Sequence, residues 1–198
     1  PLDRAEGYRY LTRLLRIALE MNLEFADPDF PGFYQASHQT AKIGADNPDN
    51  IYRTIPIDGS SRYVIRGQRV GAGPADVTFS LISNVNTQNT IQVLAGKDLV
   101  VGADGRFTIT VDADPANGRT NHIHSTSAAR QLFIRNNLGN WNNETPDALA
   151  VERLGPAPSR PPRSEVLTGL EAWVNLQESI VAYGVGALGL KTHLNPVN

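Results

Sequence analysis

Two histidines, His122 and His124, are the residues of this sequence whose type and spacing most suggest chemistry. Side chains alternate across a β-strand, so residues two apart project from the same face and both imidazoles would lie close together. Imidazole is a common metal ligand, and it is also a general base that titrates near neutral pH. The pair is therefore our candidate catalytic element.

A metal site at this pair would need a third ligand. Jelly-roll metalloenzymes of the cupin type use a His-x-His followed a few residues later by a glutamate, but Ala128 and Ala129 occupy that spacing here. His38, Asp112 or Asp114 would have to fold in to complete the coordination. The sequence therefore predicts no metal unless one of these residues completes the site. The simplest alternative is that the two imidazoles hydrogen-bond across strands at a sheet edge.

A pocket without a metal is the intermediate hypothesis. One histidine would act as general base, and Arg130 or Arg135 would hold an anionic group of a substrate through its planar fork of donors. The functional expectation is a β-sandwich protein with a polar pocket that binds or acts on a small polar or anionic molecule. The alternative is a non-catalytic module that packs against a second domain or subunit, so the sequence leaves enzymatic activity open.

A second candidate ligand-binding cluster lies around the polar segment 46–50. Short side-chain oxygens suit an Asx-type turn there, and arginines at strand ends offer forks for carboxylates. The expected members at one end of the body are Asp46, Asn47, Asp49 and Arg66, with Tyr52 and Arg135 as further members. The alternative is a purely structural turn tied down by arginine. A hard cation is a further option, but the spacing matches no calcium loop.

The strand pattern that positions these residues is clearest over 42–67. Ile51, Arg53, Ile55 and Ile57 would share one face, and Asp58-Gly59 is expected to return the chain as a hairpin. Further short strands are expected at 77–82, 91–94, 98–101, 107–111, the His122 segment, 131–135 and 149–154. Such a cadence of short strands is typical of a sandwich or jelly roll.

Helical periodicity is expected at both ends of the chain. The first helix should run to about Glu24, after which Phe30, Phe33 and Tyr34 are expected to cover a sheet edge. The predicted divisions are 1–35 for the N-terminal helix and connecting segment, 36–154 for the β-sandwich body, 155–163 for a proline-rich linker and 164–198 for a C-terminal helix and tail. The predicted fold is one mainly β domain, a jelly-roll-like antiparallel β-sandwich with an N-terminal helix and a C-terminal helix.

Composition and motifs exclude several partners. The 18 basic and 20 acidic residues give a net charge of −2 without a basic block, so nucleic acid is not expected. The absence of cysteine excludes disulfides and thiol catalysis, and no apolar run predicts a membrane span. Gly184 to Gly189 matches the spacing of a dinucleotide fingerprint, but it follows an expected helix rather than a strand, so no nucleotide cofactor is predicted. The compartment stays open.

Several motifs resemble, in the same order, a bacterial family known as domain of unknown function number twelve-fourteen. They are DRAEGYRYLTRLL, LEFADPDFP, ADNPDNIY, IDGSSRYVIRG, GRFTITV, TNHIHSTSAARQLFIRN and ALAVERLG. The resemblance implies a sandwich-type β domain with helical additions and carries no established activity. Family members are typically longer, so we expect this chain to be part of a longer protein or one subunit of a homo-oligomer, with a second domain or copy as its partner.

Overall fold

The computed structural model describes residues 2–35, 38, 47–85 and 87–156. The chain divides into two compact units, of which one comprises Asp27–Gln35 and Pro48–Pro158 and the other the remaining segments. In the latter, α1 (Leu2–Leu19) continues as a π-helical turn (Glu20–Glu24), which confirms the expected N-terminal helix and its end. No helix among the described residues has the length and apolar character needed to cross a membrane.

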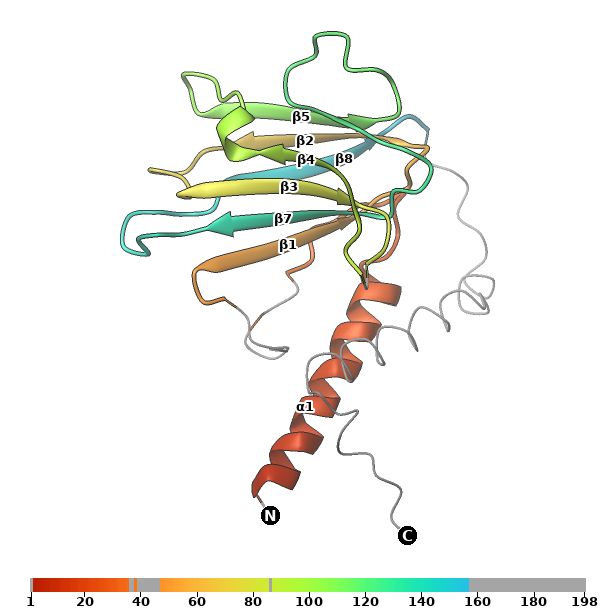
Figure 1. Ribbon diagram of the computed structural model, residues 1–198, viewed down its shortest axis with the longest axis vertical. Helices are drawn as coiled ribbons and strands as arrows, with labels where there is room; N and C mark the ends of the chain where they lie inside the picture. The colour runs from red at the N-terminus through yellow and green to blue at the C-terminus, as the bar shows by residue number, and fades with distance from the viewer. Residues whose placement is uncertain (1, 36–37, 39–46, 86, 157–198) are drawn as a thin grey trace. The chain divides into compact units, whose positions relative to one another are not determined.

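The unit that contains residues 48–158 is built from two four-stranded sheets. Its strands are β1 (Asn50–Pro56), β2 (Arg62–Gln68), β3 (Asp76–Ile82), β4 (Thr90–Ala95), β5 (Arg106–Asp112), β6 (His122–His124), β7 (Gln131–Asn137) and β8 (Ala148–Leu154). The strand order is β1-β7-β3-β4 in sheet A and β6-β5-β2-β8 in sheet B (Figure 1). Neighbouring strands are antiparallel except for the parallel pair β5 and β6. The protein is thus mainly β, as the strand cadence predicted.

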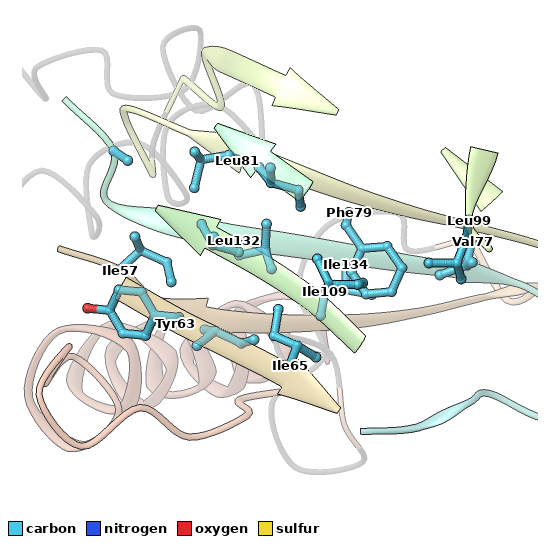
Figure 2. Packing of buried hydrophobic residues seen from close by; sticks show 14 of the residues in the cluster. Ile57, Tyr63, Ile65, Val77, Phe79, Leu81, Leu99, Ile109, Leu132 and Ile134 are labelled. Carbon is cyan, nitrogen blue, oxygen red and sulfur yellow. The ribbon is translucent and has the colours of Figure 1, made fainter. Parts of the chain in front are cut away.

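The two sheets share one apolar core, because each turns the alternate apolar residues of its strands toward the other. Sheet A contributes Ile55, Val77, Phe79, Leu81, Leu132 and Ile134, and sheet B contributes Tyr63, Ile65, Phe107, Ile109, Val111 and Ile123. Figure 2 shows several of these side chains meeting between the strands. Thr108 and Thr110 point to the outer face, as the period of two predicts.

The expected hairpin at Asp58-Gly59 is wrong, because β1 belongs to sheet A and β2 to sheet B. The turn itself exists. Asp58 accepts hydrogen bonds from the backbone of Ser60 and from the hydroxyls of Ser60 and Ser61. Burial alone would raise the pKa of Asp58. The hydrogen bonds have the larger combined effect, so the pKa of Asp58 lies below its ordinary value. The five-residue connection carries the chain across the core, whereas a two-residue turn would have kept the strands adjacent.

Other departures are local. The strand expected at 98–101 is replaced by a 3₁₀ turn (Gly96–Asp98), after which the backbone of Val100 forms hydrogen bonds with the side-chain amide of Asn121 rather than with a neighbouring strand.

The segment 27–35 belongs to the sheet unit, not to the helix, since Tyr34 and Thr54 exchange backbone hydrogen bonds at the β1 edge. Phe33 packs on the core and Phe30 is exposed. The predicted C-terminal helix lies outside the described residues.

Gly59 allows the closest approach between the connections that join the two sheets. A Cβ built on Gly59 would lie 1.8 Å from the Thr126 carbonyl oxygen, whereas one on Gly32 would meet nothing within 4 Å. We therefore predict that Gly59→Ala lowers the free energy of unfolding by about 1–3 kcal/mol through overpacking. Gly32→Ala should change it by less than about 0.5 kcal/mol. Urea titration of both variants measures this, and equal stabilities would contradict the packing described.

Candidate functional site

His122 and His124 lie on β6, at one edge of sheet B. Their parallel partners on β5 are Thr110 and Asp112, and Ile123 between them is fully buried in the core. Both imidazoles therefore project from the outer face of the sheet, with ring centroids 6.4 Å apart. The alternation in the sequence predicted this shared face correctly.

The His122 ring is closed off from substrates, since its side chain is 1% exposed. Its Nδ1 lies 2.9 Å from the Thr110 hydroxyl, and its Nε2 lies 3.1 Å from the Asp114 carbonyl oxygen and 3.2 Å from an Arg119 nitrogen. Both ring nitrogens thus already have protein partners. A general base must reach the proton it abstracts, so this ring is placed for structure rather than for catalysis.

Arg119 anchors the loop that leads from β5 to β6. Its guanidinium donates to both oxygens of Asp112, at 2.8 and 2.9 Å, and to the carbonyl oxygens of Asp114 and Pro115 at 3.1 Å. The fork of hydrogen bonds from Arg119 holds the pKa of Asp112 below its ordinary value and raises the pKa of Arg119. We call Asp112, Asp114, Arg119, His122 and His124 the histidine clamp.

His124, which is exposed, links the clamp to the other sheet. Its Nδ1 lies 3.2 Å from the Asp114 carbonyl oxygen, and its backbone N–H donates to the side chain of Gln92 on β4. No group of three or more His, Asp or Glu side chains is placed to hold a metal within the described residues. Asp112 faces Arg119 instead, and His38 lies 3.3 Å from Glu20. The clamp therefore works as a structural tie at the sheet edge.

The two arginines expected to hold an anion beside the histidines lie elsewhere. Arg130 donates to the carbonyl oxygens of Ser127 and Ala129, so it closes its own turn. Arg135 lies on the outer face of sheet A, with its guanidinium carbon 4.6 Å from the centroid of Phe133. Neither arginine has a hydrogen bond to a histidine among the described residues, so the pocket that joins them stays a prediction.

The predicted polar cluster is described only in part. Asp46 lies outside the described residues, and Asn47 belongs to the compact unit of the helix. Tyr52 and Arg135 do come together as cross-strand neighbours on sheet A, where Tyr52 stacks on Phe133. Asp49 lies just before β1, with a carboxylate oxygen 3.4 Å from the indole nitrogen of Trp141. Arg66 is not part of this group, since it lies on sheet B and pairs with Glu152 at 2.7 Å. Arg66 and Asp49 thus have different partners, and their grouping at one end of the body stays a prediction.

A buried charge bridge at the other end of the sheets was not predicted as a site. Asp147 is 1% exposed and accepts two hydrogen bonds of 3.0 Å from Arg69, while Arg53 donates to its carbonyl oxygen and to the side chain of Asn136. Burial lowers the pKa of Arg53, against the opposing charge of Asp147. The hydrogen bonds that Arg69 donates to Asp147 raise the pKa of Arg69. The sequence contained a sign of this bridge. Arg53 lies on the face of its strand that Ile55 and Ile57 turn to the core, where an arginine needs a partner.

The outer face of sheet B carries a hollow of about 390 Å³. It is lined by neighbouring residues of β2, β5 and β8, which are Arg66, Gly67, Gln68, Arg106, Phe107, Thr108, Ala148, Leu149 and Ala150. Arg66 and Arg106 thus flank a floor of small residues, because Phe107 and Leu149 turn their side chains to the core. We call this feature the cationic hollow. Sequence analysis named Arg66 but missed Arg106, although alternation with Phe107 places Arg106 on the outer face.

The fold is shared with solved structures of other proteins. The fold is similar to the crystal structure of an uncharacterized protein from Burkholderia cenocepacia, with a TM-score of 0.80 and 35% sequence identity. The match covers 92% of this chain and 51% of the other, so the chain spans about half the length of that protein. A protein from Vibrio parahaemolyticus matches with a TM-score of 0.41 and 13% identity over 52% of this chain and 31% of its own. No family model and no curated protein matches the chain.

The clamp makes stability depend on pH through Asp112. Because the folded pKa of this carboxyl lies below its ordinary value of about 3.9, its contribution is complete above about pH 5 and is lost as the pH falls through the folded pKa. We predict that Asp112→Asn lowers the free energy of unfolding by about 1–3 kcal/mol at pH 7 and that the loss shrinks in acid. Urea titrations at several pH values measure it, with the exposed Asp98→Asn as control. A loss that did not change with pH would contradict the ion pair.

The charge bridge gives a second stability prediction. Asp147→Asn removes the negative charge between two arginines, and we expect a loss of roughly 2–4 kcal/mol in the free energy of unfolding. The value lies below that of a fully buried pair because the Arg69 side chain is 31% exposed. Asp114→Asn breaks the exposed pair with Arg62 and should cost less than about 1 kcal/mol. Urea unfolding at neutral pH compares the two, and similar losses would count against a buried bridge.

Proposed function

We propose that the two-sheet unit binds a small anionic molecule with an apolar part in the cationic hollow. The observation that supports this proposal is the placement of Arg66 and Arg106 on the outer face of sheet B, around the small side chains of Ala148 and Ala150 and beside Gly67, which has no side chain. Small-molecule sites are typically concave, largely apolar and about 300–1,000 Å³ in volume, with a few polar groups that fix orientation. The hollow has a volume in this range and two arginines that could fix the orientation of a ligand.

The two arginines keep donors for an anion. Arg66 uses Nη1 for Glu152, and the Arg106 guanidinium makes no hydrogen bond among the described residues, with its nearest carboxylate, Asp104, at 3.8 Å. Guanidinium groups bind carboxylates and phosphates through paired hydrogen bonds. Both side chains are well exposed, so water screens them and we expect modest affinity. A carboxylate on an apolar body fits both parts of the hollow.

The proposal is for binding rather than catalysis. The hollow is lined by arginine, glutamine, threonine and apolar residues, and by no histidine, aspartate or glutamate. General acid–base catalysis requires a titratable group within hydrogen-bonding reach of the substrate. His122 and His124, the candidate catalytic residues, belong to the clamp at the opposite edge of the same sheet. The remaining candidates, Asp46, Asn47, Asp49, Tyr52, Arg130 and Arg135, play no part in this proposal.

The alternative proposal is a non-catalytic module that packs against a second domain or subunit. The observation that favours it is the length of the Burkholderia protein, of which this chain spans about half. Membership of the unknown-function family number twelve-fourteen and a jelly-roll description of the sheets belong to the same set of proposals. They are supported by the motifs in the sequence and by the two antiparallel-rich sheets, respectively.

Benzoate tests the binding proposal because it joins a carboxylate to an apolar ring. We predict that isothermal titration calorimetry shows benzoate binding and that Arg106→Ala weakens it at least about tenfold, a change of about 1.4 kcal/mol. Arg62→Ala is the matched control, because Arg62 lies on the same sheet face but pairs with Asp114 and does not line the hollow. Benzyl alcohol, which lacks the charge, should bind more weakly than benzoate. Equal benzoate affinity in the two variants, or no binding at all, would refute the proposal.

A further inference from the structure

The outer edge of β8 is an unusually complete strand edge. All seven residues of β8 pair with β2 without a register shift, and β8 is the last strand of sheet B. On its other side, β8 makes no backbone hydrogen bond with any described residue. None of its residues is fully buried, although Leu149 and Val151 pack against the core. An edge of this kind presents a row of unpaired N–H and C=O groups that can pair with another strand.

The other three sheet edges are protected. At the β1 edge, Tyr34 exchanges backbone hydrogen bonds of 2.8 and 2.9 Å with Thr54. Strand β4 has an irregular register beside Leu81, and its Gln92 side chain reaches across to β6. Strand β6 is only three residues long. Irregular pairing and short length are both ways in which proteins blunt strand edges. Among the described strands, β8 lacks these protections.

We infer that β8 pairs antiparallel with β8 of a second copy of this chain, which joins two sheets B into one continuous sheet. The two-fold axis that relates the copies is perpendicular to the sheet, so the outer face of one copy continues as the outer face of the other. This inference goes beyond ligand binding in the cationic hollow and does not depend on it.

The sequence of β8 selects the register of this pairing. Residues opposite one another across the axis must face the same side of the sheet, so their numbers differ by an even amount. Centring the axis on Val151 pairs all seven residues and places Glu152 opposite Ala150 and Arg153 opposite Leu149. A register centred on Glu152 would oppose two carboxylates, which is destabilising.

The charges on the edge do not prevent this pairing, although charged edge residues often do. Glu152 is 2.7 Å from Arg66, and Arg153 is 3.1 Å from Asp29 within the same copy. Each charge therefore keeps its own partner when the second strand approaches. The half-buried Val151 would gain the Val151 of the second copy as its neighbour. In this register β8 is complementary to itself, because no two like charges lie opposite one another. We therefore expect a second copy of the chain, rather than an unrelated extended peptide, as the partner of β8.

Two variants of Ala150, one with a positive and one with a negative side chain, test this pairing. Ala150→Lys would face Glu152 of the second copy and tighten the dimer several-fold, whereas Ala150→Glu would oppose that carboxylate and weaken it several-fold. Within one copy Ala150 lies beside Arg66, so the effects on monomer stability should have the opposite signs. Sedimentation velocity over a range of concentrations, without benzoate, measures the dimer. Thermal unfolding of dilute protein measures the monomer.

Single cysteines test the register independently, because the chain contains no cysteine. Val151→Cys lies on the proposed axis and should give a disulfide-linked dimer on oxidation, since opposing strand residues lie within disulfide range. Leu154→Cys would face Ala148 and should not cross-link to itself. A wild-type chain that sediments as a monomer at every concentration would overturn the inference. So would equal effects of Lys and Glu at position 150, or cross-linking through position 154 and not 151.

Discussion

Burial of one apolar face from each of two sheets is the constraint on which the rest of the structure depends. Ile55 and Leu132 on one sheet must meet Ile65 and Ile109 on the other, so every connection between the sheets has to cross the margin of the core. Polar groups at those margins lose water and need partners. Asp58, Asp112 and Asp147 each lie at such a margin, and each is held by several hydrogen bonds from nearby side chains.

This use of polar residues explains the structural contacts of the most conspicuous motif in the sequence. His122 and His124 share a face, but Arg119, Asp112 and Asp114 surround them with bonds that fix a loop to the sheet edge. The same reasoning assigns Arg53 and Arg69 to a bridge between sheets. Within the described part of sheet B, the cationic hollow of the outer face and the last strand, β8, carry neither of these two structural ties.

Local patterns predicted elements well and their partners poorly. Alternation in residues 106–112 gave the strand, its inward face and its outward threonines, because side-chain direction depends only on neighbouring residues. The turn at Asp58 was also found, since Asx chemistry is local. Which strand lies beside which depends on contacts distant in sequence. The hairpin expected between β1 and β2 failed for that reason, and the pairing of Arg66 with Glu152 was not foreseen either. Arg53, by contrast, was placed on the correct face. Its partner Asp147 could not be predicted, because the two residues are far apart in the sequence.

The central claim is that the outer face of sheet B is the ligand-binding face and that the histidine clamp beside it is structural. Two-dimensional amide NMR of the chain during a benzoate titration tests it most directly. We expect concentration-dependent shifts at residues 66–68, 106–108 and 148–150, which line the hollow, with the amides of His122, His124 and Tyr52 unchanged. Shifts centred on the histidines or on the outer face of sheet A would contradict the account.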